Sequence, residues 1–552
     1  MKNPPFYLNF YILIALMLCG IALYFVPLHS ASFYFDDHLA IEKNDAVKKI
    51  DLPKIFHAFN TRSLVGLSFA LNYKFCALNP VGYRLTNLLI HCLNAFLVYW
   101  LVKSTLYLCP ARERPLPCPM EWPALFASTL FLCHPIQTEP VNFITQRFVL
   151  MGTFFYLATL LLYIQYRRRS QKRYLLAAMV TALAAMFCKE FVVTLPLMLT
   201  LYDFYFLSAQ AEAWWMRCRR ILPFLAITLI VPLLLSRTPP DAAGVAGIAD
   251  YKYIQEGNTQ KFIKQIDITK ARGKIGRKEY FLTEWNVLRT YVRLLFVPVN
   301  QDLDYDYPLS RGMDAKTFLS GLFLLCLLAV AMVTYHSYRI VSFGVLWFFI
   351  ALSVESSVIP IGHVIAEYRL YLASVGFVLL VMDLVYALKA DLKKLNTITA
   401  IILTGFSVIT YQRNEVWKND LTLWGDTVQK SPHKARPFFC LGVAYADQGY
   451  LPQALVNYSK AIEIDPAHTD AYYNRGIVYD KQHHYTQALM DFSKAIALDP
   501  GDPDIYNNRA VTYYQLKNYD QAWEDVHKIR KLGHVVRPKI IELLKKASGR
   551  DK

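Results

Sequence analysis

The chain has 552 residues, of which 55% are hydrophobic, and its mean hydropathy is +0.25. A soluble protein of this size would be less apolar, so the composition predicts a polytopic membrane protein with a polar appendage. The formal net charge is +17, which we attribute to the Lys and Arg that hold cytoplasmic loops inside. Nucleic-acid binding is disfavoured because the sequence has no basic helix and no basic patch interleaved with aromatic residues.

Eleven apolar runs are predicted to cross the membrane, because ten are long enough to span about 30 Å of hydrocarbon and one is slightly shorter. In chain order they are 9–28, 85–107, 122–134 (the shorter one), 147–166, 173–188, 190–207, 220–236, 316–335, 339–353, 364–388 and 396–411. The segment 283–298 is different, since Arg289 and Arg293 lie four residues apart among apolar residues. We expect it to be an amphipathic helix in the membrane interface.

Three basic loops set the predicted orientation, because Lys and Arg in short loops favour the cytoplasmic side. They are 167–173, 217–220 and the lysines of 389–394. With eleven spans and a cytoplasmic N-terminus, all three loops fall on that side. The loop that holds Asp36 and the C-terminal region are then predicted to be exoplasmic. In a bacterium this is the periplasmic face of the inner membrane, and in a eukaryote the lumenal face of the endoplasmic reticulum.

Residues 435–536 repeat with a period of 34, which is the length of a tetratricopeptide repeat. Small residues such as Gly442 and Gly476 recur in register, as do aromatic residues and prolines. The sequence thus predicts an all-α protein, a polytopic membrane helix bundle (1–411) followed by a tetratricopeptide α-solenoid (412–552). Within the solenoid we expect a partial repeat at 412–434, repeats at 435–468, 469–502 and 503–536, and a cap helix at 537–549.

The repeat array is expected to present a protein acceptor. Its concave surface is predicted to carry Asn474, Arg475, Asn508 and Arg509. Their polar side chains suit hydrogen bonds to an extended backbone. The alternative is that these residues belong to the polar packing between repeats, where such side chains are also common.

Two adjacent carboxylates, Asp36 and Asp37, directly follow the first predicted span and precede His38. Charged groups beside a bilayer are costly and often mark functional sites. We interpret one of the two as a general base. Its neighbour would tune its pKa or hold a substrate hydroxyl or a divalent metal such as Mg²⁺ or Mn²⁺. The alternative is a helix cap and a solvated loop charge.

Further charged residues are predicted on the same face as the acidic pair. His134, Glu139 and Arg147 share one short loop, and we expect them to support the substrate site. Lys189 and Glu190 interrupt an apolar run. They form either a salt-bridged turn or, through Lys189, a contact to an anionic head group.

Arginines are the predicted ligands of a donor phosphate, because the planar guanidinium matches phosphate oxygens. This role is assigned to three arginines, Arg289, Arg293 and Arg369. Lys189 and His363 are expected to bind the donor phosphate with them. Further residues expected to support the substrate site are His38, Glu190, Asp304, Asp306, Glu367 and Tyr371. For the two aspartates among them, an extended loop with one solvated face is the alternative.

Carboxylates and cations on one membrane face suit glycosyl transfer from a sugar carried on a polyprenyl phosphate, with the leaving phosphate stabilised electrostatically. A Gly-rich nucleotide loop is absent from the sequence, which argues against a cytoplasmic nucleotide-sugar enzyme. Two alternatives stay open. One is a membrane-anchored scaffold whose repeats bind partners without catalysis, and the other is a ligase that transfers lipid-linked glycan to a glycan.

Six motifs taken together resemble those of the transmembrane-and-tetratricopeptide O-mannosyltransferases and their bacterial relatives, which belong to the GT-C superfamily of membrane glycosyltransferases. The motifs are Asp36-Asp37, His134-Pro135-x-x-Thr138-Glu139 with Arg147, Cys188-Lys189-Glu190-x-x-Val193-Thr194-Leu195-Pro196 with Leu201-Tyr202-Asp203, Leu303-Asp304-Tyr305-Asp306-Tyr307-Pro308, Glu367-x-Arg369-Leu370-Tyr371-Leu372 and Arg413-Asn414-x-x-Trp417.

The resemblance covers nearly the whole chain. It implies a lipid-phosphate sugar donor, a Ser/Thr protein acceptor and a catalytic acid in the first exoplasmic loop, which here is Asp36 or Asp37. Two features differ from the animal members of the family. The repeat array is much shorter, and Tyr368 stands where those proteins often carry Arg. Both differences suggest a prokaryotic relative.

Overall fold

The computed structural model describes residues 6–30, 32–109, 118–207, 214–230, 233, 275–361, 363–388 and 390–549. These residues form helices joined by loops, with no β-strand among them, which confirms the all-α prediction. They divide into two compact units. The membrane unit contains the described residues up to Leu303 and Tyr307–Asn419. The repeat unit contains Asp304–Asp306 and the described residues from Asp420 onward.

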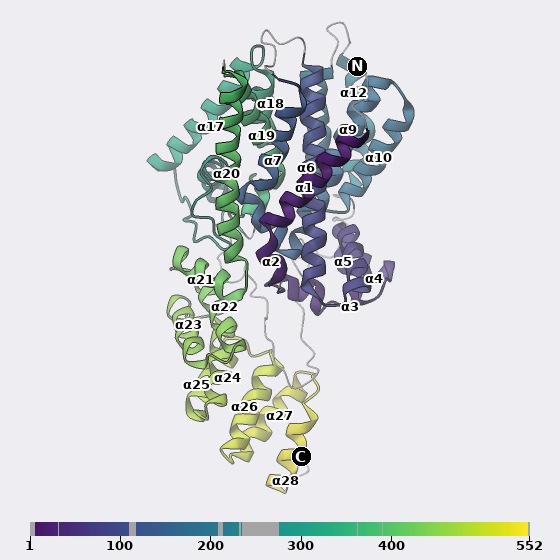
Figure 1. Cartoon of the computed structure of the whole chain (residues 1–552). Helices are drawn as coiled ribbons and strands as arrows, with labels where there is room; N and C mark the ends of the chain where they lie inside the picture. Colours follow the sequence, from purple (N-terminus) through teal and green to yellow (C-terminus); the bar gives the residue numbers. More distant parts are fainter. Residues whose placement is uncertain are drawn as a thin grey trace. The chain divides into compact units, whose positions relative to one another are not determined.

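The membrane unit is a bundle of helices (Figure 1). Its helices are α1 (Phe6–Leu23), α2 (Phe25–His29), α3 (Asp45–Lys48), α4 (Leu52–Phe59), α5 (Ser63–Cys76), α6 (Pro80–Leu108), α7 (Glu121–Cys133), α8 (Thr138–Asn142), α9 (Arg147–Arg169), α10 (Lys172–Met186), α11 (Leu195–Tyr202), α12 (Trp214–Thr228), α16 (Arg277–Phe296), α17 (Ala315–Thr334), α18 (Arg339–Leu352), α19 (Leu370–Ala387) and α20 (Leu392–Val416). The long helix α6 organises the bundle, because α1, α7 and α9 all pack against it.

Six helical stretches in the described part of the chain are long and apolar enough to cross a membrane. They are Pro80–Leu108, Ile144–Arg169, Glu190–Leu207, Ala315–Thr334, Glu367–Ala387 and Leu392–Val416. The chain is therefore a multi-pass membrane protein. Three other predicted spans correspond to shorter apolar helices, within α1, α7 and α18. The run at 173–188 forms the 15-residue α10, and 220–236 lies partly outside the described residues.

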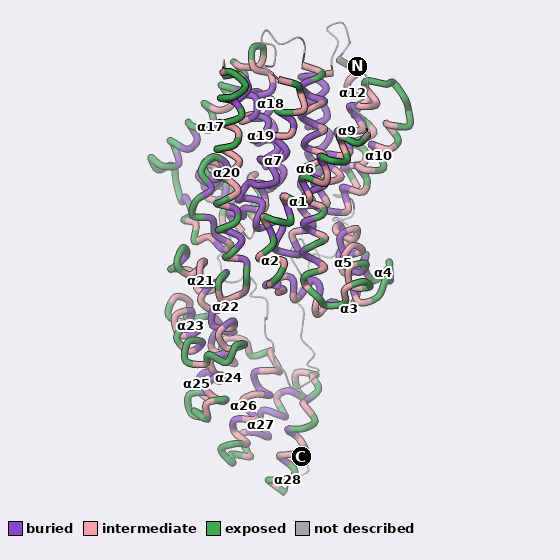
Figure 2. Tube along the Cα trace, viewed as in Figure 1, coloured by how far each residue is buried: buried purple, intermediate pink, exposed green. Residues whose placement is uncertain are grey.

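Burial is uneven across the membrane unit. Figure 2 shows α6, α7 and α19 mostly buried. In α20, by contrast, only 6% of the most apolar 18-residue stretch is buried. Helices α18 and α19 approach closely at Gly344 and Gly376, where a methyl group on either residue would overlap the carbonyl oxygen of the other. Such small-residue contacts are typical of membrane helix pairs. The exposed apolar surface of α20 suits a helix that faces lipid.

The segment after the acidic pair folds into α3, α4 and α5, which the sequence analysis did not predict. Asn44, Asp51 and Asn79 accept hydrogen bonds from backbone N–H groups at the starts of α3, α4 and α6, as N-cap residues do. Apolar residues of these helices form a small core with Phe33 and Ile144. This core holds the acidic pair's segment against the start of α9.

The repeat unit consists of helix pairs (Figure 1). Its helices are α21 (Asp420–Lys430), α22 (Ala435–Asp447), α23 (Leu451–Ile464), α24 (Thr469–Lys481), α25 (Tyr485–Leu498), α26 (Pro503–Gln515), α27 (Tyr519–Lys531) and α28 (Pro538–Ser548). The recurring small residues lie where paired helices touch. A side chain at Gly442 would collide with the ring of Tyr458, and one at Gly476 with Phe492. The period of 34 therefore has a packing cause.

Candidate functional site

The acidic pair lies in a tight turn that is held by one of its own carboxylates. Asp37 is fully buried. Its two oxygens accept hydrogen bonds from the backbone N–H groups of Tyr34 (3.1 Å) and Thr145 (2.8 Å). Phe35 adopts a positive φ of 37°, which is strained for a bulky residue. Asp37 thus stabilises a strained turn, and its neighbour Asp36 lies in the same turn.

The two aspartates have different environments. Burial raises the pKa of Asp37 to about 6, although its two backbone hydrogen bonds and the charges of Arg84 and His38 act in the opposite direction. Asp36 is only partly buried. A substrate hydroxyl can approach a carboxylate only where the carboxylate has accessible surface, so Asp36 is the better placed of the two to contact substrate.

The turn is tied to the rest of the membrane unit by Tyr34 and Arg84. The hydroxyl of Tyr34 donates to the carbonyl of Trp417 (2.6 Å). Arg84 lies 4.7 Å from the centre of the Tyr34 ring and donates to the carbonyls of Pro27 (2.6 Å) and Ser32 (3.0 Å). His38 contacts Glu42, with 2.5 Å between Nδ1 and Oε2.

Residues 134–147, which we call the connecting loop, join several of the predicted site segments. Besides Thr145, which contacts Asp37, the loop contains Asn142, whose amide donates to Asn414 (2.7 Å). Glu139 accepts a hydrogen bond from the backbone N–H of Tyr368 (3.0 Å). The connecting loop therefore brings the turn of the acidic pair, the end of α20 and the start of α19 to one place.

Two residues of the connecting loop have structural partners. His134 donates from Nε2 to the carbonyl of Leu295 (2.9 Å) and accepts from the N–H of Ile136 at Nδ1 (3.1 Å), which assigns the neutral tautomer. Arg147 is fully buried. Its guanidinium donates to Asn87 (2.7 Å), to Asn72 (2.5 Å) and to further groups of α5 and α6. Both side chains hold helices in place, and their support of the substrate site stays a prediction.

Carboxyl groups meet at the start of α19. Burial raises the pKa of Glu139 well above its usual value, the charge of Glu367 raises it further, and Arg413 and Lys189 oppose this rise. Glu367 accepts hydrogen bonds from the backbone N–H of Asp302 (2.8 Å) and from the amide of Gln301 (2.7 Å). Glu139 is therefore protonated more readily than an ordinary glutamate.

Lys189 and Glu190 pair with different partners and not with each other. Lys189 is buried, lies 3.1 Å from a carboxylate oxygen of Glu355 and sits 4.0 Å above the ring of Tyr368. Glu190 accepts two hydrogen bonds of 3.1 Å from Arg62. The turn is therefore held by two ion pairs to distant residues, and not by a salt bridge between Lys189 and Glu190. Lys189 also lies beside Tyr368, just before α19.

Arg369 is buried at the start of α19. Its terminal nitrogens donate to the backbone carbonyls of His363 (2.6 Å) and Val364 (3.1 Å). Its Nε has no hydrogen-bond partner among the described residues. Tyr371, two residues further on, points into the bundle, where its hydroxyl contacts His91 (2.7 Å) and Asn94 (3.1 Å).

The predicted amphipathic segment is the helix α16, which begins at Arg277, earlier than the sequence analysis expected. Arg289 is partly buried near Tyr307. Arg293 is exposed and donates to the carbonyl of Val299 (2.9 Å), just beyond the end of the helix. The buried face of α16 contains a carboxylate that the sequence analysis missed, Glu284.

Asp304 and Asp306 belong to the repeat unit. Asp304 forms ion pairs with Lys434 and Arg436. The backbone N–H of Asp306 donates to Ser431 (2.8 Å). Within this unit the two aspartates bind the start of the repeat array, and their support of the substrate site stays a prediction.

The four residues predicted to bind an acceptor have partners inside the repeat array. Arg475 donates two hydrogen bonds of 2.8 Å to Asp491 and one of 3.0 Å to Ser459. Arg509 repeats this pattern 34 residues later with Asp525 and Ser493. The amides of the other two residues also have partners, since Asn474 donates to the carbonyl of Asp470 and Asn508 to the hydroxyl of Tyr473. The geometry favours the alternative in which these residues are part of the packing.

Replacing Arg475 with Ala is expected to destabilise the repeats by about 1–3 kcal/mol, since it removes charge-assisted hydrogen bonds and leaves Asp491 buried without them. Asp491→Ala should cost a similar amount, and the double variant little more than either one. Hydrogen-exchange protection of α23–α25 in the full chain measures this cost. If Arg475→Ala left protection unchanged but weakened binding of an acceptor protein, the arginine would be a binding residue after all.

A metal site is not assigned by the geometry. No group of three or more His, Cys, Asp or Glu side chains in the described part of the chain is arranged to hold a metal ion. The divalent metal predicted at Asp36 and Asp37 stays a prediction. Both oxygens of Asp37 already accept backbone hydrogen bonds.

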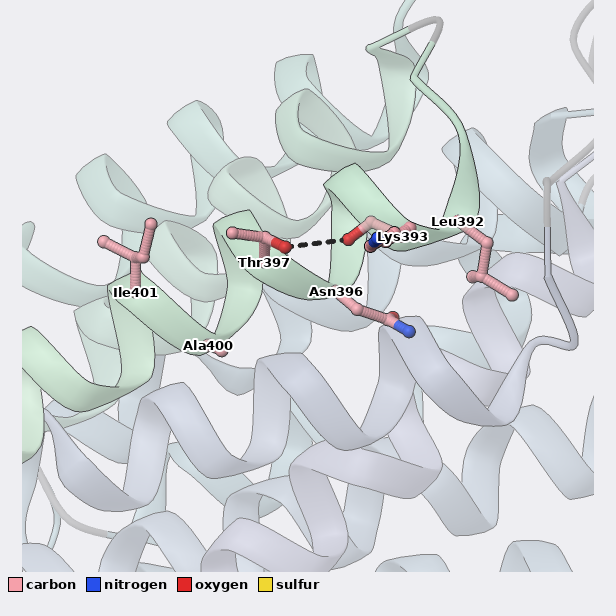
Figure 3. Close-up of a pocket in the computed structure, with 6 residues that line it drawn as sticks. All are labelled: Leu392, Lys393, Asn396, Thr397, Ala400 and Ile401. Atoms are coloured by element: carbon pink, nitrogen blue, oxygen red, sulfur yellow. Dashed lines mark hydrogen bonds between the residues drawn. The ribbon is translucent and has the colours of Figure 1, made fainter.

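Figure 3 shows a depression on the surface of α20, and all of its lining residues come from this one helix. They are Leu392, Lys393, Asn396, Thr397, Ala400 and Ile401. The only hydrogen bond drawn there joins Thr397 to the carbonyl of Lys393 (3.0 Å), within the helix. The depression shares no residue with the connecting loop or with the acidic pair.

Three family models match the repeat unit. One, described as a TPR repeat, covers residues 442–483, and two described as a tetratricopeptide repeat cover 469–502 and 492–524. Together with the membrane helices, these matches define the class of protein. The chain is a multi-pass membrane protein that carries a tetratricopeptide domain.

Its relatives are protein O-mannosyl-transferases. The chain is 25% identical over 413 residues to the protein O-mannosyl-transferase F38B6.6 of Caenorhabditis elegans, covering 74% of this chain and 54% of that protein. It is 23% identical to human TMTC1 over 74% of this chain and 48% of the relative, and 24% identical to Drosophila melanogaster Tmtc3 over 73% and 48%. These matches confirm the resemblance drawn from the motifs. The chain spans about half the length of the curated relatives it matches.

Two solved structures show a weaker likeness. The crystal structure of MamA is 20% identical and covers 28% of this chain and 82% of its own, with a TM-score of 0.19. The APC/C hetero-tetramer Cut9-Hcn1 is 12% identical and covers 90% of this chain and 91% of its own, with a TM-score of 0.22. Such low scores carry no argument about the fold, which rests on the helices described above.

Proposed function

We propose that this protein is a membrane glycosyltransferase that moves a sugar from a polyprenyl-phosphate donor to Ser or Thr hydroxyls of a protein. One observation supports this proposal most strongly. The connecting loop hydrogen-bonds both to the turn of Asp36 and Asp37 and to the short helical turn Glu367–Arg369, which directly precedes α19. A base and a phosphate-binding cation held by one loop suit group transfer from a phosphate ester. The relatives' name, protein O-mannosyl-transferase, makes mannose the first sugar to test.

In the proposed reaction, Asp36 takes the proton of the acceptor hydroxyl. The hydroxyl oxygen forms a bond to the anomeric carbon of the sugar as the bond from that carbon to the phosphate oxygen breaks. The electron pair leaves with the polyprenyl phosphate, whose new charge Arg369 and Lys189 stabilise. Asp37 acts as a positioning residue, because its carboxylate holds the turn that carries Asp36.

The repeats are proposed to bind the acceptor protein. The exoplasmic orientation of the repeats and of the acidic pair is also a proposal. It is supported by the three basic loops of the sequence and by the rule that such loops stay in the cytoplasm. The two alternatives are a scaffold without catalysis and a glycan ligase. A scaffold would transfer no sugar, and a ligase would transfer it to a glycan instead of a protein.

Mass spectrometry of exported proteins distinguishes the three proposals. Cells that express the full chain should contain proteins with hexose on Ser or Thr, and cells that express Asp36→Asn should lack them. A scaffold predicts no hexose-modified protein that depends on Asp36, and it retains its partners in both strains. A ligase predicts a change in envelope glycans with unmodified proteins. Either of these results would contradict protein O-glycosylation.

A further inference from the structure

A buried carboxylate on α16 has no well-aligned hydrogen-bond partner among the residues that the structure describes. Glu284 is 1% exposed, and neither of its carboxylate oxygens accepts a hydrogen bond from any described residue. Ser356 and Tyr280 lie close enough to this carboxyl to lower its pKa by hydrogen bonding, as the charge of Arg369 also does, but none of the three makes a well-aligned hydrogen bond with it. The Nε of Arg369 and the Oγ of Ser356 are themselves buried without partners in the described structure. We call Glu284, Arg369 and Ser356 the Glu284 cluster.

Unsatisfied polar atoms of this kind are rare inside proteins. Most buried polar groups are paired, and an unpaired charged group carries a large desolvation cost. The Glu284 cluster combines a carboxyl, a guanidinium N–H and a hydroxyl. These three groups can accept and donate hydrogen bonds to one ligand that carries both hydroxyls and an anionic oxygen.

The residues around the cluster are fixed by partners of their own. Tyr280 donates to the carbonyl of Glu355 (3.1 Å), and Tyr291 donates to the carbonyl of Ala366 (3.0 Å). The side chain of Glu355 pairs with Lys189. The surrounding groups thus form a fixed frame, while the Glu284 carboxylate, the Nε of Arg369 and the Oγ of Ser356 keep unused hydrogen-bonding capacity within the described structure.

The segment that follows α18 joins the cluster to an apolar surface. It contains Ser356, whose hydroxyl is buried, and two and three residues further on Val358 and Ile359 are 53% and 67% exposed. An exposed apolar tip next to a buried polar cluster suits an amphiphilic ligand with its chain outside and its head group inside. A polyprenyl-phosphate sugar has this chemistry.

We propose that the Glu284 cluster binds the sugar-phosphate head group of the donor, with Arg369 donating to a phosphate oxygen and the Glu284 carboxyl hydrogen-bonding to a sugar hydroxyl. This inference rests on the proposed function and deepens it, because it makes Glu284 a specificity-determining residue. Arginine suits phosphate oxygens. A site that hydrogen-bonds a substrate hydroxyl rejects analogues that lack it.

The ionisation of Glu284 should then affect donor binding. Burial raises the pKa of Glu284 to about 7 and the charge of Glu355 raises it further, whereas the charge of Arg369 and the nearby hydroxyls of Ser356 and Tyr280 lower it. The ionisable side chains that face it are Arg369, Glu355 and Tyr280, with Tyr291 also close. Above this pKa the ionised carboxylate repels the donor phosphate, and below it the neutral acid does not. KM for the donor should therefore fall as the pH falls through about 7.

The test uses the purified full chain, polyprenyl-phosphate mannose and a set of donors that each lack one sugar hydroxyl. For the wild type, one of these deoxy donors should be used about tenfold less well. With the mannose donor, Glu284→Ala should have a kcat/KM about tenfold below that of the wild type. With that deoxy donor, the kcat/KM of the variant should fall no further. Glu284→Gln mimics the neutral acid, so it should keep most activity and lose the dependence of KM on pH near 7. Glu279→Gln is the matched control: Glu279 is partly buried at the start of α16, where its carboxylate accepts a hydrogen bond from the N–H of Gly276, and the Gln oxygen can still accept it. This variant should behave like the wild type.

Donor binding, measured as thermal stabilisation by polyprenyl-phosphate mannose, separates this inference from the proposed function. Binding that depends on Glu284 without any transfer would support the cluster and overturn the enzyme proposal. Transfer with unchanged selectivity and pH dependence in both Glu284 variants would overturn the inference, since the cluster would then hold only water. Absence of donor binding by the wild type would overturn it as well.

Discussion

Replacing Asp36 with Asn is expected to slow sugar transfer about a hundredfold or more, which is the usual cost of removing a general base. The amide has the shape of the carboxylate but cannot take the proton of the acceptor hydroxyl. Because Asp36 is only partly buried, the variant should keep the wild-type unfolding temperature. Initial rates with saturating donor and a Ser/Thr peptide measure the effect. Transfer at the wild-type rate would show that Asp36 is not the base.

Asp37→Asn should behave differently and serves as the comparison. An amide has one oxygen, so it can accept only one of the hydrogen bonds that now come from Tyr34 and Thr145. Its NH₂ group would face the N–H that it no longer binds. We expect a loss of about 1–3 kcal/mol in stability, seen as a lower unfolding temperature. A variant that is fully stable but inactive would instead indicate that Asp37 is the base.

Arg369→Ala is expected to reduce donor use by about tenfold to a hundredfold, since a hydrogen bond to a charged group contributes roughly 1.5–3 kcal/mol. Arg369→Lys should recover part of this loss, because the charge returns but the planar fork does not. The measurement is kcat/KM for the polyprenyl-phosphate sugar. Arg277→Ala removes an exposed charge from the start of α16 and is the matched control.

The sequence analysis proposed Arg289 and Arg293 for the same role, so their Ala variants belong in this experiment. Arg293 is exposed and binds the carbonyl of Val299, and we expect its loss to change kcat/KM less than the loss of Arg369. If Arg293→Ala were the more damaging variant, the donor phosphate would bind at the end of α16 and not at the start of α19.

The repeats and most membrane helices could be predicted because their signals are local. A period of 34 follows from one packing contact that recurs, such as Gly442 against Tyr458. A long apolar run has few ways to satisfy its backbone other than a membrane helix. The short helices α3, α4 and α5 were missed, although Asn44 and Asp51 are ordinary N-cap residues and a search for such caps could have found them.

The roles of individual site residues could not be predicted, because they depend on contacts between distant segments. Asp36 and Asp37 are identical and adjacent in sequence, yet only Asp37 meets the N–H of Thr145, 108 residues away. Arg147 and Arg475 look like binding residues in a linear sequence, but both make several hydrogen bonds inside their own units. Glu284 gave no signal, since one acidic residue in an amphipathic helix is usually solvated.

The central claim is that this chain transfers sugar from a polyprenyl phosphate to protein. The most direct test mixes the purified full chain with radiolabelled polyprenyl-phosphate mannose and a Ser/Thr peptide, with and without Mg²⁺ and Mn²⁺, and follows label into the peptide. We predict labelled peptide with the wild type and about a hundredfold less with Asp36→Asn. No labelled peptide under any metal condition, from folded protein that still binds its protein partners, would contradict the claim and favour the scaffold.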